Sequence, residues 1–216
     1  MQNNSENKIS FSSIATIVVI AISLIVFALF MIKKIDKSTK AKVEQTQPSD
    51  SESLIGGDFS LESTKDINFT QRDLKGKISL LYFGFGHCPD VCPTTMQVIT
   101  VALENIPQIF QDKVQTLFVT LDPERDTIES LKGFVAKFHP STIGLRGDKE
   151  QLKQITENYK IYFSKEKSKT NDKNDYLVDH SSVIYLLDKE GKYVNHFTYK
   201  NGSEEITTAV LKIINN

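Results

Sequence analysis

The stretch Ile78-Ser-Leu-Leu-Tyr-Phe-Gly-Phe-Gly-His-Cys-Pro-Asp-Val-Cys-Pro93 joins an apolar run to a pair of cysteines. Ile78–Phe85 is almost entirely apolar or aromatic, which is typical of a strand buried on both faces of a sheet. A helix is expected next, because apolar residues recur there at spacings of three and four. These residues are Met96, Ile99, Leu103 and Ile106. The cysteines therefore fall where a buried strand ends and a helix begins, the sheet edge at which function concentrates in open α/β folds.

Strand and helix signals alternate along the rest of the chain. Leu117–Leu121 is predicted to be a second buried strand, and Ser182–Leu187 with Lys192–Tyr199 a hairpin. Three further helices are predicted from apolar faces and N-terminal capping residues. The capping residues are Asp126 with Glu129, Asp148 with Gln151, and Ser203. The order βαβ followed by ββα predicts an α/β fold of the thioredoxin-like type with a mixed central sheet.

The N-terminal part of the chain has the composition of a membrane anchor. Residues 9–32 contain no charged side chain, and a helix that spans a bilayer needs ~20 apolar residues. A cleaved signal peptide would have a shorter apolar run and a small-residue cleavage site, which this segment does not offer. We therefore expect a transmembrane helix at 9–32 after a short flank at 1–8. The first 40 residues contain no arginine, which favours a bacterial membrane over a mitochondrial presequence.

The remaining residues divide into a tether and one domain. Residues 33–54 are polar and charged, as in a flexible linker. The compact domain is expected at 55–216, with an exposed, highly charged insertion at about 164–175. The formal net charge of the chain is -1, and only three of its 26 basic residues are arginine. Because bidentate phosphate recognition relies on arginine, this composition argues against a nucleic-acid partner.

Two cysteines, Cys88 and Cys92, are too few to form a disulfide framework, and they predict a redox pair, a metal pair or both. Residues four apart on a helix share a face, with Cβ atoms ~5–6 Å apart. The free N–H groups and dipole of a helix N-terminus stabilise thiolates. Two thiolates suit a soft ion such as Cu(I) or Zn(II). Structural zinc usually takes four ligands, whereas Cu(I) accepts fewer.

Four segments resemble motifs of the Sco/SenC family, which assists assembly of the dinuclear copper centre of cytochrome c oxidase. Gly84–Pro93 (GFGHCPDVCP) is similar to the copper motif of that family. The others, in order along the chain, are Gly56–Leu61 (GGDFSL), Val119–Thr127 (VTLDPERDT) and Asp175–Ser182 (DYLVDHSS). The resemblance covers roughly residues 55–215, and four motifs in order are far more specific than one pair of cysteines.

The resemblance implies a copper site and a role for it. Its copper ligands would be Cys88, Cys92 and His180, holding Cu(I) and also Cu(II). Asp90, between the cysteines, and Asp122, at the end of the second strand, would lie near the metal. The implied function is that of a membrane-anchored copper chaperone, and the implied partner is the copper-binding subunit of cytochrome c oxidase. The other histidines, which are His87, His139 and His196, are expected to be structural or exposed to solvent.

The implied location is the bacterial inner membrane, with the domain on the periplasmic side. The charges beside the anchor point the other way, because five lysines follow the helix and only Lys8 precedes it. The positive-inside rule applied to those lysines would place the domain in the cytoplasm. The five are Lys33, Lys34, Lys37, Lys40 and Lys42.

Three other functions fit parts of the sequence. A thiol–disulfide oxidoreductase would share the fold, but its usual spacing is Cys-x-x-Cys. Such enzymes place a cis-proline opposite the cysteines, whereas this chain has no proline after Pro140 and has His180 in that place. A peroxiredoxin-type peroxidase needs proline and threonine ahead of its cysteine, and Leu81–His87 contains neither. A copper or redox sensor would use the same cysteine pair and remains an alternative.

Overall fold

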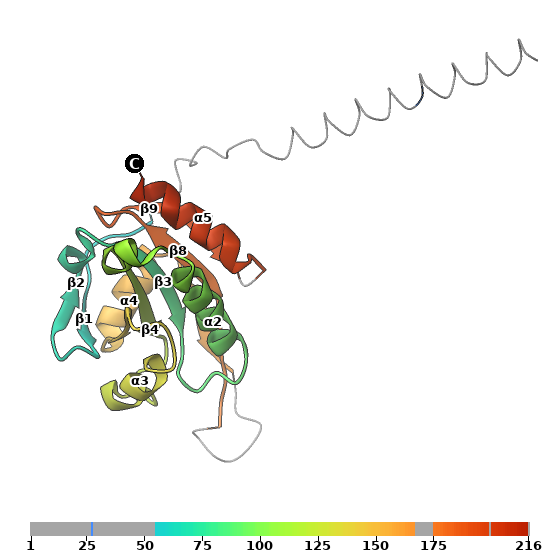
Figure 1. Cartoon of the computed structure of the whole chain (residues 1–216). Coiled ribbons are helices and arrows are strands. Elements are labelled where there is room, and N and C mark those ends of the chain that lie inside the picture. The colour runs from blue at the N-terminus through green and yellow to red at the C-terminus, as the bar shows by residue number, and fades with distance from the viewer. Residues whose placement is uncertain (1–26, 28–54, 167–174, 199, 216) are drawn as a thin grey trace, which may run out of the picture. The chain divides into compact units, whose positions relative to one another are not determined.

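The computed structural model describes Phe27 and residues 55–166, 175–198 and 200–215 (Figure 1). The chain divides into two units, Met1–Ser49 and Asp50–Asn216, and the fold below is that of the second unit. Apart from Phe27, the predicted flank, anchor and tether at 1–8, 9–32 and 33–54 lie outside the described residues. Most of the predicted insertion, residues 167–174, does so too. Among the described residues, no helix combines the length and the apolar character needed to cross a bilayer.

Seven strands form one mixed sheet, in the order β2-β1-β5-β4-β3-β8-β9 (Figure 1). The three strands β3, β4 and β5 run parallel to one another, and β8 pairs antiparallel with β3. The predicted α/β fold with a mixed central sheet is therefore confirmed. The strands are β1 (Ser60–Ser63), β2 (Asn68–Thr70), β3 (Ile78–Gly84), β4 (Val114–Thr120), β5 (Thr142–Arg146), β8 (Val183–Leu187) and β9 (Tyr193–Thr198).

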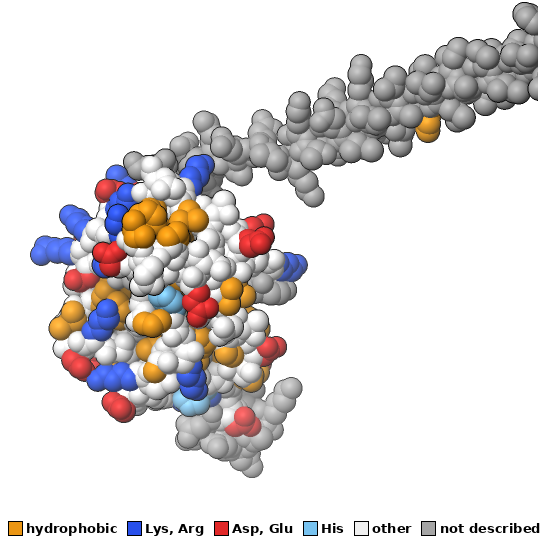
Figure 2. Space-filling model, viewed as in Figure 1, with side chains coloured by type: hydrophobic (Ala, Val, Ile, Leu, Met, Phe, Trp, Pro, Cys, Tyr) orange, Lys and Arg blue, Asp and Glu red, His pale blue; other side chains and the backbone are white. Residues whose placement is uncertain are grey.

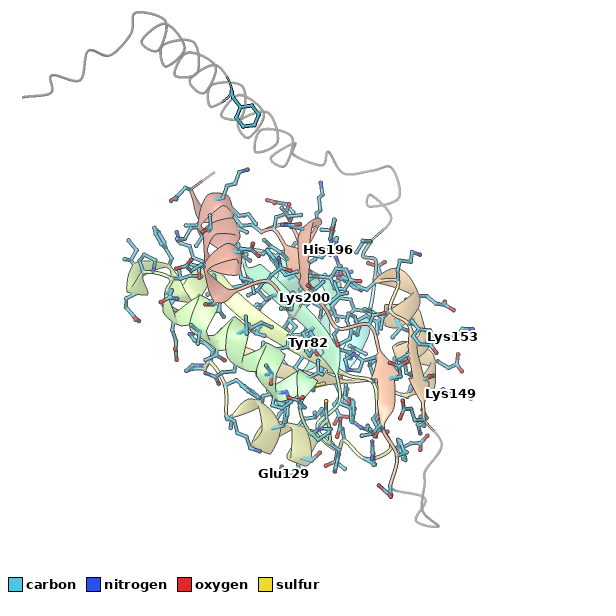
Figure 3. The ribbon with its side chains drawn as sticks, turned by 90° about the vertical axis from the view of Figure 1, so that its right-hand side faces the viewer. Tyr82, Glu129, Lys149, Lys153, His196 and Lys200 are labelled. Carbon is cyan, nitrogen blue, oxygen red and sulfur yellow. The ribbon has the colours of Figure 1, made fainter. Side chains whose placement is uncertain are left out.

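Every residue of β3 and β4 is buried, because helices cover both faces of the sheet. Figure 3 shows α2 (Val91–Glu104) and α5 (Ser203–Ile214) on one face and α4 (Lys149–Asn158) on the other. A further helix is α3 (Ile128–Val135), and two short 3-10 helices lie at Gln71–Leu74 and Gln108–Lys113. Outside this core, positive and negative side chains are interspersed over the face in Figure 2.

The helix caps differ from their prediction in two of three cases. The Asp148–Gln151 capping box of α4 is confirmed. The cap of α3 is Thr127, whose side chain accepts a hydrogen bond from the Ser130 N–H at 3.1 Å, so the prediction of Asp126 as the cap is wrong. Ser203 is the first residue of α5 rather than its cap, which is Gly202 without a side-chain bond.

A separate two-stranded sheet includes the first residues of the predicted insertion. Its strands are β6 (Phe163–Lys165) and β7 (Val178–His180), paired antiparallel with Phe163 opposite His180. Ser164 and Lys165, at the start of the predicted insertion, lie in β6. This pair of strands, which we call the β6–β7 arm, is not part of the seven-stranded sheet.

Candidate metal centre

The two cysteines lie where β3 gives way to α2, as the sequence predicted. Cys92 is in the first turn of α2 and fully buried, whereas Cys88 precedes the helix and is half-buried. Both are free thiols, and the backbone N–H of Cys92 donates to the Cys88 sulfur at 3.4 Å. That N–H is one of the unpaired donors at the start of a helix, so the helix N-terminus is directed at the Cys88 sulfur.

His180 ends β7 and faces the same cysteines. Its Nε2 lies 3.5 Å from the Cys92 sulfur, and its Nδ1 lies 3.2 Å from the Ser181 carbonyl oxygen. A carbonyl oxygen can only accept, so Nδ1 donates that bond, and the uncharged imidazole with this tautomer has its lone pair on Nε2. The rings of Phe85 and Tyr82 pack edge-on against the imidazole, with centroids 6.0 and 6.2 Å away. Figure 3 shows Tyr82 in the interior of the domain.

These donors suit a soft metal ion in both spacing and chemistry. An ion held ~2.3 Å from a sulfur and ~2.0 Å from a nitrogen leaves the two donors ~3.7 Å apart in trigonal geometry. The Cys92–His180 separation of 3.5 Å is close to that value. Across the described residues, no three or more His, Cys, Asp or Glu side chains are already clustered as a complete metal site. The fit therefore rests on the donor set of two thiols and one imidazole, which is the kind that Cu(I) prefers.

The two thiols share a proton unequally. The hydrogen bond from the Cys92 thiol lowers the pKa of Cys88 to about 5, against the opposing effect of burial, and the N–H groups of Cys92 and Asp90 add to the lowering. The pKa of Cys92 is raised, first by its bond to Cys88 and then by its own burial. At neutral pH the pair therefore holds one thiolate, on Cys88, and one proton, on Cys92.

Asp90 and Asp122, the aspartates that the resemblance places near the metal, have different surroundings. Asp90 is exposed, is the N-cap residue of α2 without a side-chain capping bond, and accepts from the Thr94 hydroxyl at 3.4 Å. Asp122 follows β4 and is completely buried. Its carboxylate pairs with the Arg125 guanidinium and accepts from the Tyr176 hydroxyl at 2.7 Å.

Asp126 is a residue of the site that the sequence interpretation missed. Its buried carboxylate accepts hydrogen bonds from the Gly86 N–H at 2.8 Å, the Thr120 hydroxyl at 2.5 Å and His87 Nδ1 at 3.0 Å. Asp126 therefore ties the loop that precedes Cys88 to the end of β4. The sequence offers one signal for this role. Thr127 is already a good cap for the following helix, so Asp126 is not needed as a cap.

Two glycines leave room for these contacts. A Cβ on Gly84 would lie 2.8 Å from the Cys92 sulfur and 3.0 Å from the Phe118 ring. A Cβ on Gly86 would lie 2.9 Å from Asp126 Oδ1. Glycine is therefore needed at position 84 for the Cys92 sulfur to lie close to the backbone, and at position 86 for the Asp126 carboxylate to do so.

The other three histidines have partners away from the cysteine pair. His87 is half-exposed and turns toward Asp126. His139 Nδ1 lies 2.8 Å from the Ser141 hydroxyl, and His196 Nδ1 lies 2.6 Å from the Tyr193 hydroxyl. The structure thus places His180, of the four, beside a cysteine sulfur.

A shallow groove opens from Cys88 and His180 to solvent. It has a volume of about 240 Å³ and runs between the start of α2 and the β6–β7 arm. Val91 and Leu177, on its two sides, are 40% and 47% exposed. A donor atom from another protein could therefore reach the Cys88 sulfur without any opening of the core.

Comparisons with known proteins agree on one family. The SCO1/SenC family model matches residues 47–215. An SCO2-like protein of Rickettsia conorii is 36% identical over 199 residues, which are 92% of this chain and 96% of the relative. The structure of Bradyrhizobium japonicum ScoI with copper bound is 36% identical, with a TM-score of 0.67 over 74% of this chain and 99% of that one. Yeast Sco1 with copper bound is 34% identical, with a TM-score of 0.68 over 75% of this chain and 89% of that one.

Proposed function

Because the chain belongs to the SCO1/SenC family, we propose that it is a copper chaperone whose copper ligands are Cys88, Cys92 and His180. The observation that carries the proposal is the 3.5 Å separation of the Cys92 sulfur and His180 Nε2, from residues 88 positions apart in the chain. Copper in the related structures of B. japonicum ScoI and yeast Sco1 supports the choice of metal.

The thiolate on Cys88 provides a first anionic donor, and loss of the Cys92 proton on metal binding provides a second. His180 supplies the third donor through Nε2. Copper is the cargo, and the groove beside Cys88 gives a partner's ligands access to it for exchange. The Sco family is one of cytochrome c oxidase assembly proteins, so the proposed recipient is the copper-binding subunit of that oxidase. Cu(II) is proposed as a second bound state in which His180 matters more.

Metal analysis of the full-length chain, loaded with Cu(I) under reducing conditions and then desalted, tests this proposal. We expect about one copper per chain. Retention of zinc in preference to copper, or of no metal, would contradict the proposal.

We also propose that residues 9–32 anchor the chain in a bacterial inner membrane, with the tether at 33–54 and the domain at 55–216 on the periplasmic side. The Rickettsia conorii relative supports a bacterial setting. The five lysines after residue 32 oppose this orientation. We expect a periplasm-dependent reporter fused after residue 216 to be active, and activity of a cytoplasm-dependent reporter at the same position would reverse the assignment.

Thiol–disulfide exchange is the second candidate function, favoured by the low pKa of the half-buried Cys88. The Cys88 thiolate would attack a target disulfide and release one target thiol. Cys92 would then attack Cys88 and release the second, leaving a Cys88–Cys92 disulfide. The target gains two electrons from the cysteine pair and two protons, one from Cys92 and one from solvent. An external dithiol must then reduce the Cys88–Cys92 disulfide before the next cycle. This activity is compatible with copper delivery, because reduced target cysteines are needed to receive the metal.

The alkylation rate of Cys88 is expected to rise with pH and to reach half of its maximum near pH 5. The thiolate is the nucleophile, so the rate rises as pH passes the Cys88 pKa of about 5 and is level at neutral pH. Iodoacetamide labelling of the native chain, read at each cysteine by mass spectrometry, measures it. Buried Cys92 should react far more slowly, and both should titrate near ~8.5 after unfolding. A native Cys88 midpoint near ~8.5 would remove the basis of this second function.

A further inference from the structure

We propose that Asp122, Arg125 and Tyr176 form a clamp that positions His180 against the cysteine pair. Arg125 and Tyr176 are then positioning residues for the metal centre, acting through the β6–β7 arm rather than by touching the metal. The part of this inference that concerns copper rests on the proposed function. The part that concerns the position of His180 does not.

Asp122 is the fixed point of the clamp. It follows β4, the strand beside β3 at the centre of the sheet, and its carboxylate is completely buried. A buried carboxylate is costly unless it is paired and hydrogen-bonded. Oδ2 pairs with Arg125 Nε, and Oδ1 accepts from the Tyr176 hydroxyl at 2.7 Å. Each carboxylate oxygen therefore has a partner, one from its own loop and one from the segment that leads into β7.

Arg125 holds the same segment by two more contacts. Its Nη1 donates to the Tyr176 carbonyl oxygen at 2.9 Å, and its guanidinium stacks on the Tyr176 ring at 3.6 Å. The planar guanidinium can bond a carboxylate, bond a carbonyl and stack at the same time, which a lysine ammonium cannot do. Tyr176 is thus held through its hydroxyl, its ring and its backbone.

The clamp reaches His180 by two routes. Tyr176 lies two residues before β7, and His180 is the last residue of that strand. Because the β6–β7 arm is separate from the main sheet, ladder hydrogen bonds of the main sheet do not fix it. The second route is Phe85, whose ring lies 5.8 Å from the Arg125 guanidinium and 6.0 Å from the His180 ring. Arg125 therefore links the loop that carries the cysteines to the arm that carries the histidine.

The Tyr176→Phe variant tests the clamp with little other disturbance, since it removes one hydroxyl and keeps the ring under Arg125. The first measurement uses metal-free, full-length protein and records the nuclear Overhauser contact between the His180 and Phe85 rings. We expect a strong contact in the wild type and a weakened one in Tyr176→Phe and in Arg125→Lys. The matched control is Tyr162→Phe, because Tyr162 is exposed and its hydroxyl bonds only locally, to Ser164 at 3.1 Å. An unchanged ring contact in both clamp variants would overturn the inference.

The second measurement is a double-mutant cycle on copper affinity. Changes to groups that orient metal ligands typically cost ~10–100-fold in affinity, and we expect the lower end of that range for Tyr176→Phe. In a His180→Ala background the same change should have no effect, because the residue that it positions is gone. An equal loss in both backgrounds would mean a general structural role and would refute the clamp. Failure of the wild type to bind copper would refute the proposed function, while the ring contact would still decide whether the clamp positions His180.

Discussion

Replacing Cys88 or Cys92 by serine is expected to abolish copper binding. A serine hydroxyl stays protonated at neutral pH and is a hard oxygen donor, so it cannot replace a thiolate toward Cu(I). We expect the copper affinity to fall by more than ~100-fold. Mutation of residues that only hydrogen-bond to a metal ligand already costs ~10–100-fold in metal affinity, and loss of a ligand should cost more. His180→Ala should weaken binding without abolishing it, because two thiolates remain. Competition with a chromophoric Cu(I) chelator gives the affinities.

The controls separate loss of a ligand from loss of the fold. Cys88 is half-buried, so serine there should leave stability nearly unchanged. Cys92 is fully buried, and a hydroxyl in its place costs ~1–3 kcal/mol if it finds no partner. Thermal unfolding of both variants therefore accompanies the affinity measurement. His196→Ala is the matched histidine control, because His196 is exposed and bonds Tyr193. Full copper binding by Cys88→Ser would overturn the proposed ligand set.

The centre of the fold could be predicted because its strands are buried on both faces. All seven residues of β3 and of β4 are buried, and their apolar runs are visible without any tertiary information. The strands β1, β2 and β5 were missed because they have three to five residues and mix apolar with polar side chains. Their pairing comes from the sheet that they join, which a local pattern does not contain.

In the candidate site, too, the residues close together in sequence could be predicted from their spacing, whereas the distant residue could not. Spacing alone placed Cys88 and Cys92 at a strand end and a helix start, and the structure has them there. Nothing in the spacing brings His180 to Cys92, because their approach depends on pairing between β3 and β8 and on the β6–β7 arm. His180 was therefore predicted from family resemblance. Asp126 was misread because an aspartate next to a helix start has an ordinary explanation as a cap.

Asp126→Ala is expected to destabilise the domain by ~2–4 kcal/mol and to free the loop before Cys88. The carboxylate accepts three hydrogen bonds, from Gly86, Thr120 and His87. Hydrogen bonds to a charged group are worth ~1.5–3 kcal/mol each, but their contributions overlap and the half-exposed His87 can bond water instead. Urea unfolding of the full-length chain measures the change in the free energy of unfolding.

The accompanying change in the loop distinguishes this role of Asp126 from that of a helix cap. Without the carboxylate, the Gly86 amide loses its acceptor and should exchange with solvent much faster, whereas the first amides of α3 keep their bonds to Thr127. Asp90→Ala is the matched control, because Asp90 is an exposed aspartate of the same loop and should cost less than ~0.5 kcal/mol. A variant in which α3 frays while Gly86 stays protected would restore the cap interpretation. Faster exchange at Gly86 without fraying of α3 would mean that Asp126 fixes the loop that precedes Cys88.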